Sequence, residues 1–343
     1  MNNMAWFFSK SSDEGIVLTS RIRLARNIDG VPFPHILDKD SAKKVVEDVT
    51  SAILDSNSAI SKDFDVINLK DITLNERMSL VEKHLISKDL INRSDISAVM
   101  INKQKNVSIM INEEDHIRLQ VIYPGFKLKE AYELASKIDD LIEERITYSY
   151  DTRLGYLTSC PTNVGTGLRA SVMLHLPALT ITKNINNIIN TINQVGLTIR
   201  GLYGEGSNAL GNVYQISNQI TLGLSEEEII NNLIAVTNKI VEKEKKAREM
   251  LLEKQSVELE DELYRALGIL KYARSISTQE SLELISKVRM GVEMGIIKDV
   301  NVDKLNELFV NVQPATLQLL EKRDLSPKDR DIVRARLIRE KLN

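Results

Sequence analysis

The chain has 343 residues, enough for about two domains at roughly 150 residues each. Hydrophobic residues make up 43% and charged residues 27%, an ordinary composition that excludes a disordered tail, a collagen-like fibre and a disulfide scaffold. Lys and Arg total 45 against 48 Asp and Glu, so the net charge of −3 indicates no general affinity for nucleic acid or an anionic membrane.

Targeting signals and cysteine content limit the cellular compartment in which the protein is expected. A single cysteine, Cys160, excludes an internal disulfide. Residues 1–15 show neither the basic segment nor the apolar stretch of a signal peptide, and no run of about 18 or more apolar residues occurs. We therefore expect a cytoplasmic protein that does not span a membrane.

The first two thirds of the chain indicate a mixed α/β region. Residues 20–24 alternate polar and apolar side chains, as a half-buried strand does, and residues 103–106 join two β-rich runs as a hairpin would. Short strands with hairpin-length links favour an antiparallel sheet with helices packed on it. The predicted strands are 20–24, 96–101, 107–111, 118–123, 171–176, 195–200 and 213–217, and the predicted helices are 40–54 and 128–144.

Beyond residue 224 the pattern becomes helical. Capping-box sequences at 225–228 and 277–280 predict two helix starts, and Pro314 and Pro327 predict two more. The fold class is therefore α+β, an antiparallel sheet flanked by helices followed by an all-α C-terminal domain. We place the sheet-containing domain at 1–224, a helical connection at 225–255 and the C-terminal domain at 256–343.

Five arginines lie in or beside strand and loop signals rather than on helix faces. Arg21 and Arg23 are two residues apart, so in a strand they point to the same side. The guanidinium group binds two oxygens at once and suits a polyphosphate, although a solvated strand face is an equally good interpretation of this pair. The five are Arg21, Arg23, Arg118, Arg169 and Arg200.

Two further segments carry reactive side chains. Residues 113–115 place three acids in a row directly after a predicted strand, which is typical either of a solvated acidic turn or of a carboxylate site for a cation. Cys160 lies among hydroxyl residues and loop formers rather than in an apolar run, which favours a functional thiol over a buried one. No spacing typical of metal ligands occurs.

Residues 200–211 form a glycine-punctuated loop that carries one acid, Glu205. Such a loop is either a surface connection or a lid over a substrate. Neither the P-loop pattern nor a dinucleotide-binding glycine pattern after a strand occurs, so a Walker-type or Rossmann nucleotide site is not expected.

Taken together, four stretches resemble the catalytic domain of the phosphagen (ATP:guanido) kinases. They are SRIR at 20–23, INEEDHIR at 111–118, SCPTNVGTGLRASVMLHLPAL at 159–179 and RGLYGEGS at 200–207. Only 19 residues precede the first stretch, where animal-type members carry a helical domain, and about 120 residues follow the kinase-like part. This layout resembles the bacterial protein arginine kinases, and an open site suited to a protein-borne arginine is expected.

The resemblance implies a role for each matching residue. Glu114 would hold the acceptor guanidinium and act as the base, Glu205 would clamp it from the other side, and Cys160 would touch it without becoming a covalent nucleophile. ATP would be bound with Mg²⁺, which would be held mainly by phosphates and water. The implied ATP-binding residues are Ser20, Arg21, Ile22, Arg23, Leu24, His84, Arg118, Arg169, Ala170, Ser171, Val172, Met173, Arg200, Gly201, Leu202, Tyr203 and Gly204. As a lone helical histidine, His84 fits a structural role equally well.

The predicted helix after Pro327 carries a second motif. Residues 321–341 hold eight Lys and Arg against five Asp and Glu, which is typical of a basic solvated face. The resemblance implies instead an allosteric phosphoarginine-binding site, with Arg330 and Arg334 on the phosphate, Asp331 on the guanidinium, Ala335 in the same motif and Arg336 as a further candidate. A helix-turn-helix that binds nucleic acid is the alternative, which the interleaved acids disfavour.

The resemblance also implies partners. It points to protein substrates with exposed arginines, a McsA-type zinc-binding activator, a Clp-type unfoldase or protease that receives the marked proteins, a heat-shock repressor as client, and a homodimer. Two other functions stay open at this point. One is a kinase of free arginine or another small guanidine, and the other is a non-catalytic phosphoarginine-binding adaptor.

Overall fold

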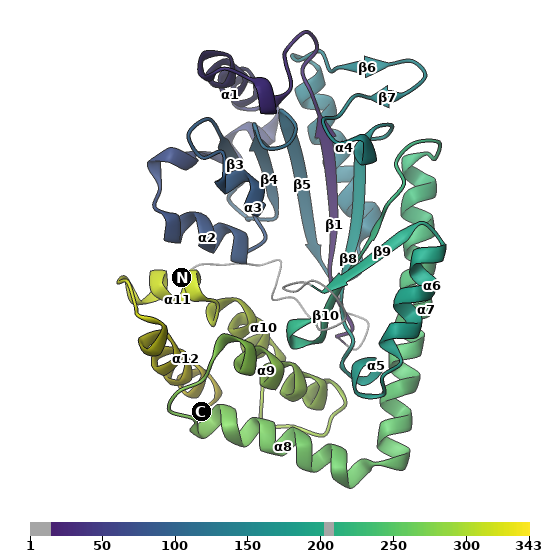
Figure 1. Cartoon of the computed structure of the whole chain (residues 1–343), viewed down its shortest axis with the longest axis vertical. Coiled ribbons are helices and arrows are strands. Elements are labelled where there is room, and N and C mark those ends of the chain that lie inside the picture. Colours follow the sequence, from purple (N-terminus) through teal and green to yellow (C-terminus); the bar gives the residue numbers. More distant parts are fainter. Residues whose placement is uncertain (1–14, 202–208) are drawn as a thin grey trace.

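A computed structural model of the chain describes residues 15–201 and 209–343, and its centre is an eight-stranded antiparallel sheet (Figure 1). The strands lie in the order β2-β3-β4-β5-β1-β8-β10-β9, so β1, the first strand of the chain, is central. Their bounds are β1 Val17–Arg26, β2 Phe64–Asn68, β3 Ala98–Asn102, β4 Val107–Ile111, β5 Ile117–Pro124, β8 Leu168–His175, β9 Leu197–Gly201 and β10 Val213–Asn218, and β6 Tyr150–Asp151 pairs with β7 Gly155–Tyr156 in a separate hairpin.

One side of the sheet faces a helical layer. Ile22 and Leu24 of β1 and Val172 of β8 are buried on that side. α4 (Leu128–Glu143) packs on β1 and β5, and α7 (Glu226–Lys254) packs on β8 and β10. Strand residues alternate between the two faces, so every second residue of the central strands points away from these helices. The sheet is thereby apolar on its helix-covered side and free to carry polar groups on the other.

The C-terminal part is helical, as the sequence predicts. α7 begins at a complete capping box, in which the Ser225 side chain accepts the Glu228 N–H and the Glu228 side chain accepts the Ser225 N–H. At Ser277 only half of the expected box forms, because the hydroxyl accepts the Glu280 N–H and the structure gives these two described residues no return bond. Helices begin at Pro314 and Pro327 as expected. The helices of this part are α8 Ser256–Tyr272, α9 Thr278–Glu293, α10 Val302–Asn311, α11 Pro314–Glu321 and α12 Pro327–Leu342.

The antiparallel sheet with flanking helices and the helical C-terminal region confirm the predicted fold class. Several elements were not predicted, namely β2, the β6–β7 hairpin, α2 Leu74–Glu82, α3 Lys88–Ile91, α5 Pro177–Ile181 and α6 Ile185–Gln194, while α1 Lys39–Leu54 was expected. Most of these are too short to show a clear period in the sequence. No helix among the described residues is long and apolar enough to cross a bilayer.

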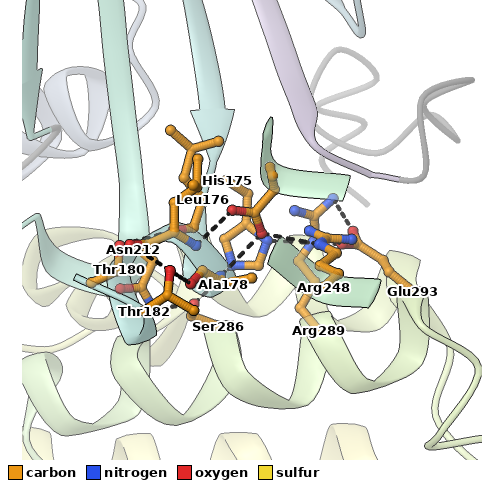
Figure 2. Close-up of polar contacts among 12 residues, drawn as sticks. His175, Leu176, Ala178, Thr180, Thr182, Asn212, Arg248, Ser286, Arg289 and Glu293 are labelled. Atoms are coloured by element: carbon orange, nitrogen blue, oxygen red, sulfur yellow. Dashed lines mark hydrogen bonds and ion pairs between the residues drawn. The ribbon is translucent and has the colours of Figure 1, made fainter. Parts of the chain in front are cut away.

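A buried polar cluster joins the C-terminal helices to the sheet (Figure 2). Glu293 of α9 pairs with Arg248 of α7 at 3.2 Å and with Arg289 of its own helix at 2.8 Å. His175, at the end of β8, lies 2.8 Å from the Ser286 hydroxyl of α9. Burial lowers the pKa of His175 to about 4, so this imidazole is neutral near pH 7. The C-terminal helices are therefore anchored to the strand that carries Arg169.

Candidate active site

The five arginines selected from the sequence lie on one face of the sheet, opposite the helical layer. The strand register shows this directly, because Arg23 pairs with Arg169 across β1 and β8, and Arg118 pairs with Ala25, two residues along β1. Arg200 of β9 pairs with Gln215 of β10. Directly paired residues share a face, so four strands bring these guanidinium groups together as an arginine face, defined as Arg21, Arg23, Arg118, Arg169 and Arg200.

The arginine face is electrostatically unfavourable without an anion. Burial, together with the charges of Arg118 and Arg169, lowers the pKa of Arg21 to about 10. Burial lowers the pKa of Arg23 well below its ordinary value, with further contributions from the same neighbours. The buried Nε of Arg23 has no hydrogen-bond partner among the described residues. A bound polyanion would relieve this repulsion, which is the property expected of a polyphosphate site.

Two polar side chains orient Arg21 on this face. Its Nη2 donates to Gln215 Oε1 at 2.6 Å, and its Nε donates to the Ser171 hydroxyl at 3.2 Å. Ser171 belonged to the predicted nucleotide-binding set, whereas the sequence analysis missed Gln215. Alternation along residues 213–217 could have identified it, because Gln215 lies between two apolar core residues of β10, Tyr214 and Ile216.

The acidic row after β4 divides into structural and exposed members. Glu113 is buried, accepts a hydrogen bond from Ser87 and is paired with Arg118. Asp115 is also buried and accepts the Asn27 amide and the Ser159 N–H, both at 2.7 Å. Since both oxygens of Glu113 and Oδ1 of Asp115 have partners within the protein, the row is neither a simple solvated turn nor three equivalent ligands.

Glu114 is the exposed member of the row. One of its carboxylate oxygens lies 3.8 Å from Arg118 Nη2, at the edge of the arginine face. Partial burial raises the pKa of Glu114 above its ordinary value, the neighbouring acids add to the rise, and Arg118 and a hydrogen bond with Cys160 oppose it. A carboxyl with a raised pKa beside a cationic pocket has the properties of a general base.

Cys160 reaches Glu114 because the two loops are tied together. The bond from the Ser159 N–H to Asp115 holds the cysteine loop against the acidic turn. The Cys160 sulfur also lies 3.0 Å from the Thr162 hydroxyl. Burial and the charges of Arg200 and Arg118 lower the pKa of Arg169, and the proximity of Cys160 and Glu114 opposes this change. The thiol, the carboxylate and the arginine face therefore form one site.

His84 lies at the other end of the arginine face. It follows α2 with a positive φ of 56°, and its carbonyl accepts the Gln120 amide at 2.8 Å. Its side chain lines a small cavity with Arg21, Ser171 and Gln215. Burial and the charge of Arg21 lower the pKa of His84 to about 3, so the ring is neutral at physiological pH.

Other predicted nucleotide-binding residues do not reach the arginine face. The side chains of Ile22, Leu24, Ala170 and Val172 belong to the core on the helix-covered side. Ser20 is buried, donates to the Gly125 carbonyl and accepts the Lys127 N–H, which makes it a structural residue. These five side chains therefore do not contact a ligand bound to the arginine face. Met173 lines the same small cavity as His84, and Gly201 is the last residue of β9. Leu202, Tyr203, Gly204 and Glu205 lie outside the described residues.

The C-terminal arginine motif lies on α12, apart from the arginine face. Arg334 is buried and donates to the carbonyls of Val312 and Ile276, each at 2.8 Å, and its Nη1 lies 2.5 Å from Asp331. Ala335 is buried, and Arg336 donates to Glu321 at 2.6 Å. Arg334 and Asp331 therefore hold the C-terminal helices together, and Arg330 is half-buried on the same helix face.

The described residues contain no group of three or more His, Cys, Asp or Glu side chains placed to hold a metal ion. This donor set does not provide a protein cage for a cation.

Comparison with known proteins gives two family matches. Residues 44–247 match the ATP:guanido phosphotransferase C-terminal catalytic domain, and residues 256–343 match the protein-arginine kinase McsB C-terminal domain. Two similar proteins are the protein-arginine kinases of Clostridium kluyveri and Caldanaerobacter subterraneus. The first is 53% identical over 100% of this chain and 99% of its own length, and the second is 51% identical over 96% and 98%.

Solved structures agree with the fold. A lombricine kinase is 28% identical, with a TM-score of 0.59 over 71% of this chain and 70% of its own. The duplicated taurocyamine kinase from Schistosoma mansoni with bound transition state analog components has a TM-score of 0.60, covering 81% of this chain and 40% of its own, and at 24% identity it supports the fold alone.

Proposed function

This chain belongs to the ATP:guanido phosphotransferase family, among its protein-arginine kinases, and from that premise we propose how its residues move the γ-phosphate of ATP onto an arginine side chain. The observation that carries the proposal is the meeting of a five-arginine face with Glu114 and Cys160 at one edge. Cationic and acidic groups are thus placed for the two reactants of a phosphoryl transfer between ATP and a guanidinium.

The arginine face binds the phosphates of ATP. Arg21, held by Gln215 and Ser171, presents its guanidinium in a fixed orientation, and the mutual repulsion of the five cations is relieved when the anion binds. This arrangement also neutralises charge on the transferred group, which is the main contribution a protein makes to phosphoryl transfer. Where ATP binds as its Mg²⁺ complex, the phosphates and water would hold the cation rather than a cage of side chains, and the cation would supply further positive charge.

Glu114 and Cys160 bind the acceptor. A guanidinium is always protonated near neutral pH, so its nitrogen must be oriented and must lose a proton as the N–P bond forms. The bond between the γ-phosphorus and the oxygen that bridges it to the β-phosphorus breaks in the same step, and ADP leaves. Glu114 orients the group and takes the proton, and Cys160 contacts it from the adjacent loop. Glu205, outside the described residues, is proposed from the resemblance to bind the acceptor from the opposite side.

The α12 motif is proposed as a second site that binds phosphoarginine and regulates activity. Its support is the group of Arg330, Asp331 and Arg334 on one helix, with Arg334 already tied to the carbonyls before α9 and α11. Charge reversal at Arg330 tests this site, because that side chain is half-buried rather than enclosed. The proposal is refuted if the Arg330→Glu variant binds free phosphoarginine with wild-type affinity.

The cellular setting is proposed from the resemblance alone. We place the protein in the cytoplasm as a homodimer that marks proteins for a Clp-type protease, with a McsA-type activator and a heat-shock repressor among its partners. Pull-down of tagged protein from stressed cells, followed by identification of phosphoarginine-bearing clients, tests this set.

The catalytic proposal is tested with purified protein, MgATP, an arginine-rich protein and free arginine offered side by side. Phosphoarginine is mapped by mass spectrometry under non-acidic conditions, with Glu114→Ala as the control. Label on the protein alone, lost in the control, supports the proposal. Label on free arginine would assign a small-guanidine kinase, and no label in the presence of activator would assign a phosphoarginine-binding adaptor.

A further inference from the structure

Glu82, the last residue of α2, is a buried carboxylate that reaches into the C-terminal helices. One of its oxygens accepts the Ala315 N–H at 2.8 Å. The other accepts the Thr316 N–H and the Thr316 hydroxyl, both at 2.7 Å. These donors belong to the first turn of α11, more than 200 residues later in the chain, and α11 lies against α2 (Figure 1).

The carboxylate supplies the cap that α11 lacks. The N-cap residue, Gln313, makes no side-chain cap bond, and the first N–H groups of any helix have no partner within it. Glu82 satisfies two of them with charge-assisted bonds, at the end of the helix where a negative charge is favourable. Its loss would leave buried N–H groups unpaired, so the position of α2 relative to α11 depends on this residue.

The residue two positions after Glu82 is His84, at the edge of the arginine face. The chain turns sharply between them, with the His84 N–H bonded to the Val81 carbonyl and the His84 carbonyl bonded to Gln120. This short turn cannot shift without moving the histidine ring that lines the cavity with Arg21. The end of α2 is therefore held between α11 on one side and the sheet on the other.

α11 is held from its second side by the α12 motif. Arg334 donates to the Val312 carbonyl, two residues before Pro314 begins the helix. The start of α11 thus lies between Arg334 and Glu82, and a path runs from Arg334 through α11 to Glu82 and, two residues further along the chain, to His84.

We propose that Glu82 is a positioning residue for nucleotide binding: by capping α11 it fixes the His84 turn against Arg21 and makes the C-terminal helices part of the nucleotide site. The inference rests on the proposed function in one respect, that His84 contacts the bound nucleotide. It goes further in giving the C-terminal helices a defined influence on ATP affinity.

The test is Glu82→Gln in the full chain, with ATP and ADP affinity measured by calorimetry and kcat and KM measured with an arginine-rich protein. We expect nucleotide affinity to fall roughly 10-fold, the scale of one lost charged hydrogen bond. The KM for the protein substrate should stay within about 2-fold, because the hydrogen bonds that the Glu82 carboxylate accepts come from α11 and not from the acidic row.

A matched control lies at the other end of the same helix. The Glu76 carboxylate accepts the N–H and the hydroxyl of Thr73, so Glu76→Gln loses similar bonds without touching the α11 cap. Unchanged nucleotide affinity in Glu76→Gln is expected. Equal losses in both variants would show that general weakening of α2 explains the effect and would overturn the proposal.

A double-mutant cycle with His84→Ala separates the inference from the proposed function. If Glu82 acts through His84, Glu82→Gln should cost no further affinity in the His84→Ala background. Additive losses, or a fall in thermal stability alone, would refute the positioning role. Wild-type ATP affinity in His84→Ala would instead refute the nucleotide contact of His84.

A milder variant covers the case in which Glu82→Gln does not fold. Thr316→Val removes the hydroxyl that donates to Glu82 and lies 3.2 Å from the Ser79 hydroxyl, and it leaves the two backbone donors in place. We expect nucleotide affinity to fall about 2- to 3-fold, less than in Glu82→Gln, because two of the three hydrogen bonds to the carboxylate remain. Unchanged affinity in a folded Thr316→Val would count against the proposal.

Discussion

Replacing Glu114 by Gln is the sharpest test of the proposed chemistry. Of the three acids in the row it is the exposed one, whereas Glu113 and Asp115 are engaged within the protein. The substitution keeps the size of the side chain and removes a proton acceptor whose oxygen lies 3.8 Å from Arg118. A positioned base contributes about 10²- to 10⁴-fold to a rate. We therefore expect kcat to fall by that factor, a barrier increase of about 3–5 kcal/mol.

Nucleotide affinity should respond with the opposite sign. Removing a negative charge beside the arginine face raises its positive potential, so ATP should bind Glu114→Gln as tightly as the wild type or more tightly. ADP release with an arginine-rich protein measures kcat, and calorimetry measures ATP affinity. The reasoning fails if kcat stays within about 10-fold of the wild type, or if ATP affinity falls together with kcat.

The pH dependence adds an independent check on the same residue. Partial burial is the chief cause of the raised pKa of Glu114, so the active carboxylate forms at a higher pH than that of an ordinary glutamate. The acceptor guanidinium does not titrate there. Activity measured as ADP release should therefore rise with pH as Glu114 ionises, and Glu114→Gln should lack this dependence. The same acid limb in the variant would assign the titration to another group.

Three further predictions concern charge and stability. Arg169→Gln should weaken ATP binding about 10-fold. It should also stabilise the nucleotide-free protein, because burial and the charges of Arg200 and Arg118 already lower the pKa of Arg169. A lower melting temperature without ATP would contradict this prediction. Asp139→Ala removes the carboxylate that lies 2.7 Å from the buried Arg26 guanidinium. We expect the free energy of unfolding to fall by about 3–5 kcal/mol, which is roughly 4–7 °C in Tm for a chain of this length. A fall in Tm of less than about 1 °C would refute this prediction. Burial lowers the pKa of His175 to about 4, against about 6.5 in the unfolded chain. Between these two pH values the unfolded chain binds a proton that the folded chain does not. The free energy of unfolding should therefore fall by about 2 kcal/mol from pH 7 to pH 5. Urea titrations of wild type and His175→Gln at both pH values check this, and an equal loss in the variant would assign it elsewhere.

Much of the fold was predictable because its signals are local. Alternation at residues 20–24 identified β1, and the sequence at Ser225 identified the start of α7. The same-face relation of Arg21 and Arg23 also followed from strand geometry alone. Short elements such as α3, with four residues, carry too little periodicity to be recognised in this way.

The sequence predicted which residues form the candidate site but not how they are arranged. The sequence provided the five arginines, the acidic row and Cys160. The family resemblance singled out Glu114, but the residue types alone did not separate the three acids. Their division depends on partners that are distant in the sequence, such as Asn27 for Asp115 and Ser87 for Glu113. Gln215 was missed for the same reason, because its role depends on a side-chain hydrogen bond with Arg21, almost 200 residues earlier in the chain.

The sequence by itself determined the family, seven of the strands and the residue types that the chemistry needs, because motifs and periodicity act over a few neighbouring residues. Only the tertiary structure decided that β1, β5, β8 and β9 bring five like charges to one face, that Glu114 is the exposed acid, and that Glu82 caps a helix of the C-terminal part. The physical reason is that burial and pairing between distant segments set the charge state and position of each group, and neither can be obtained from local sequence.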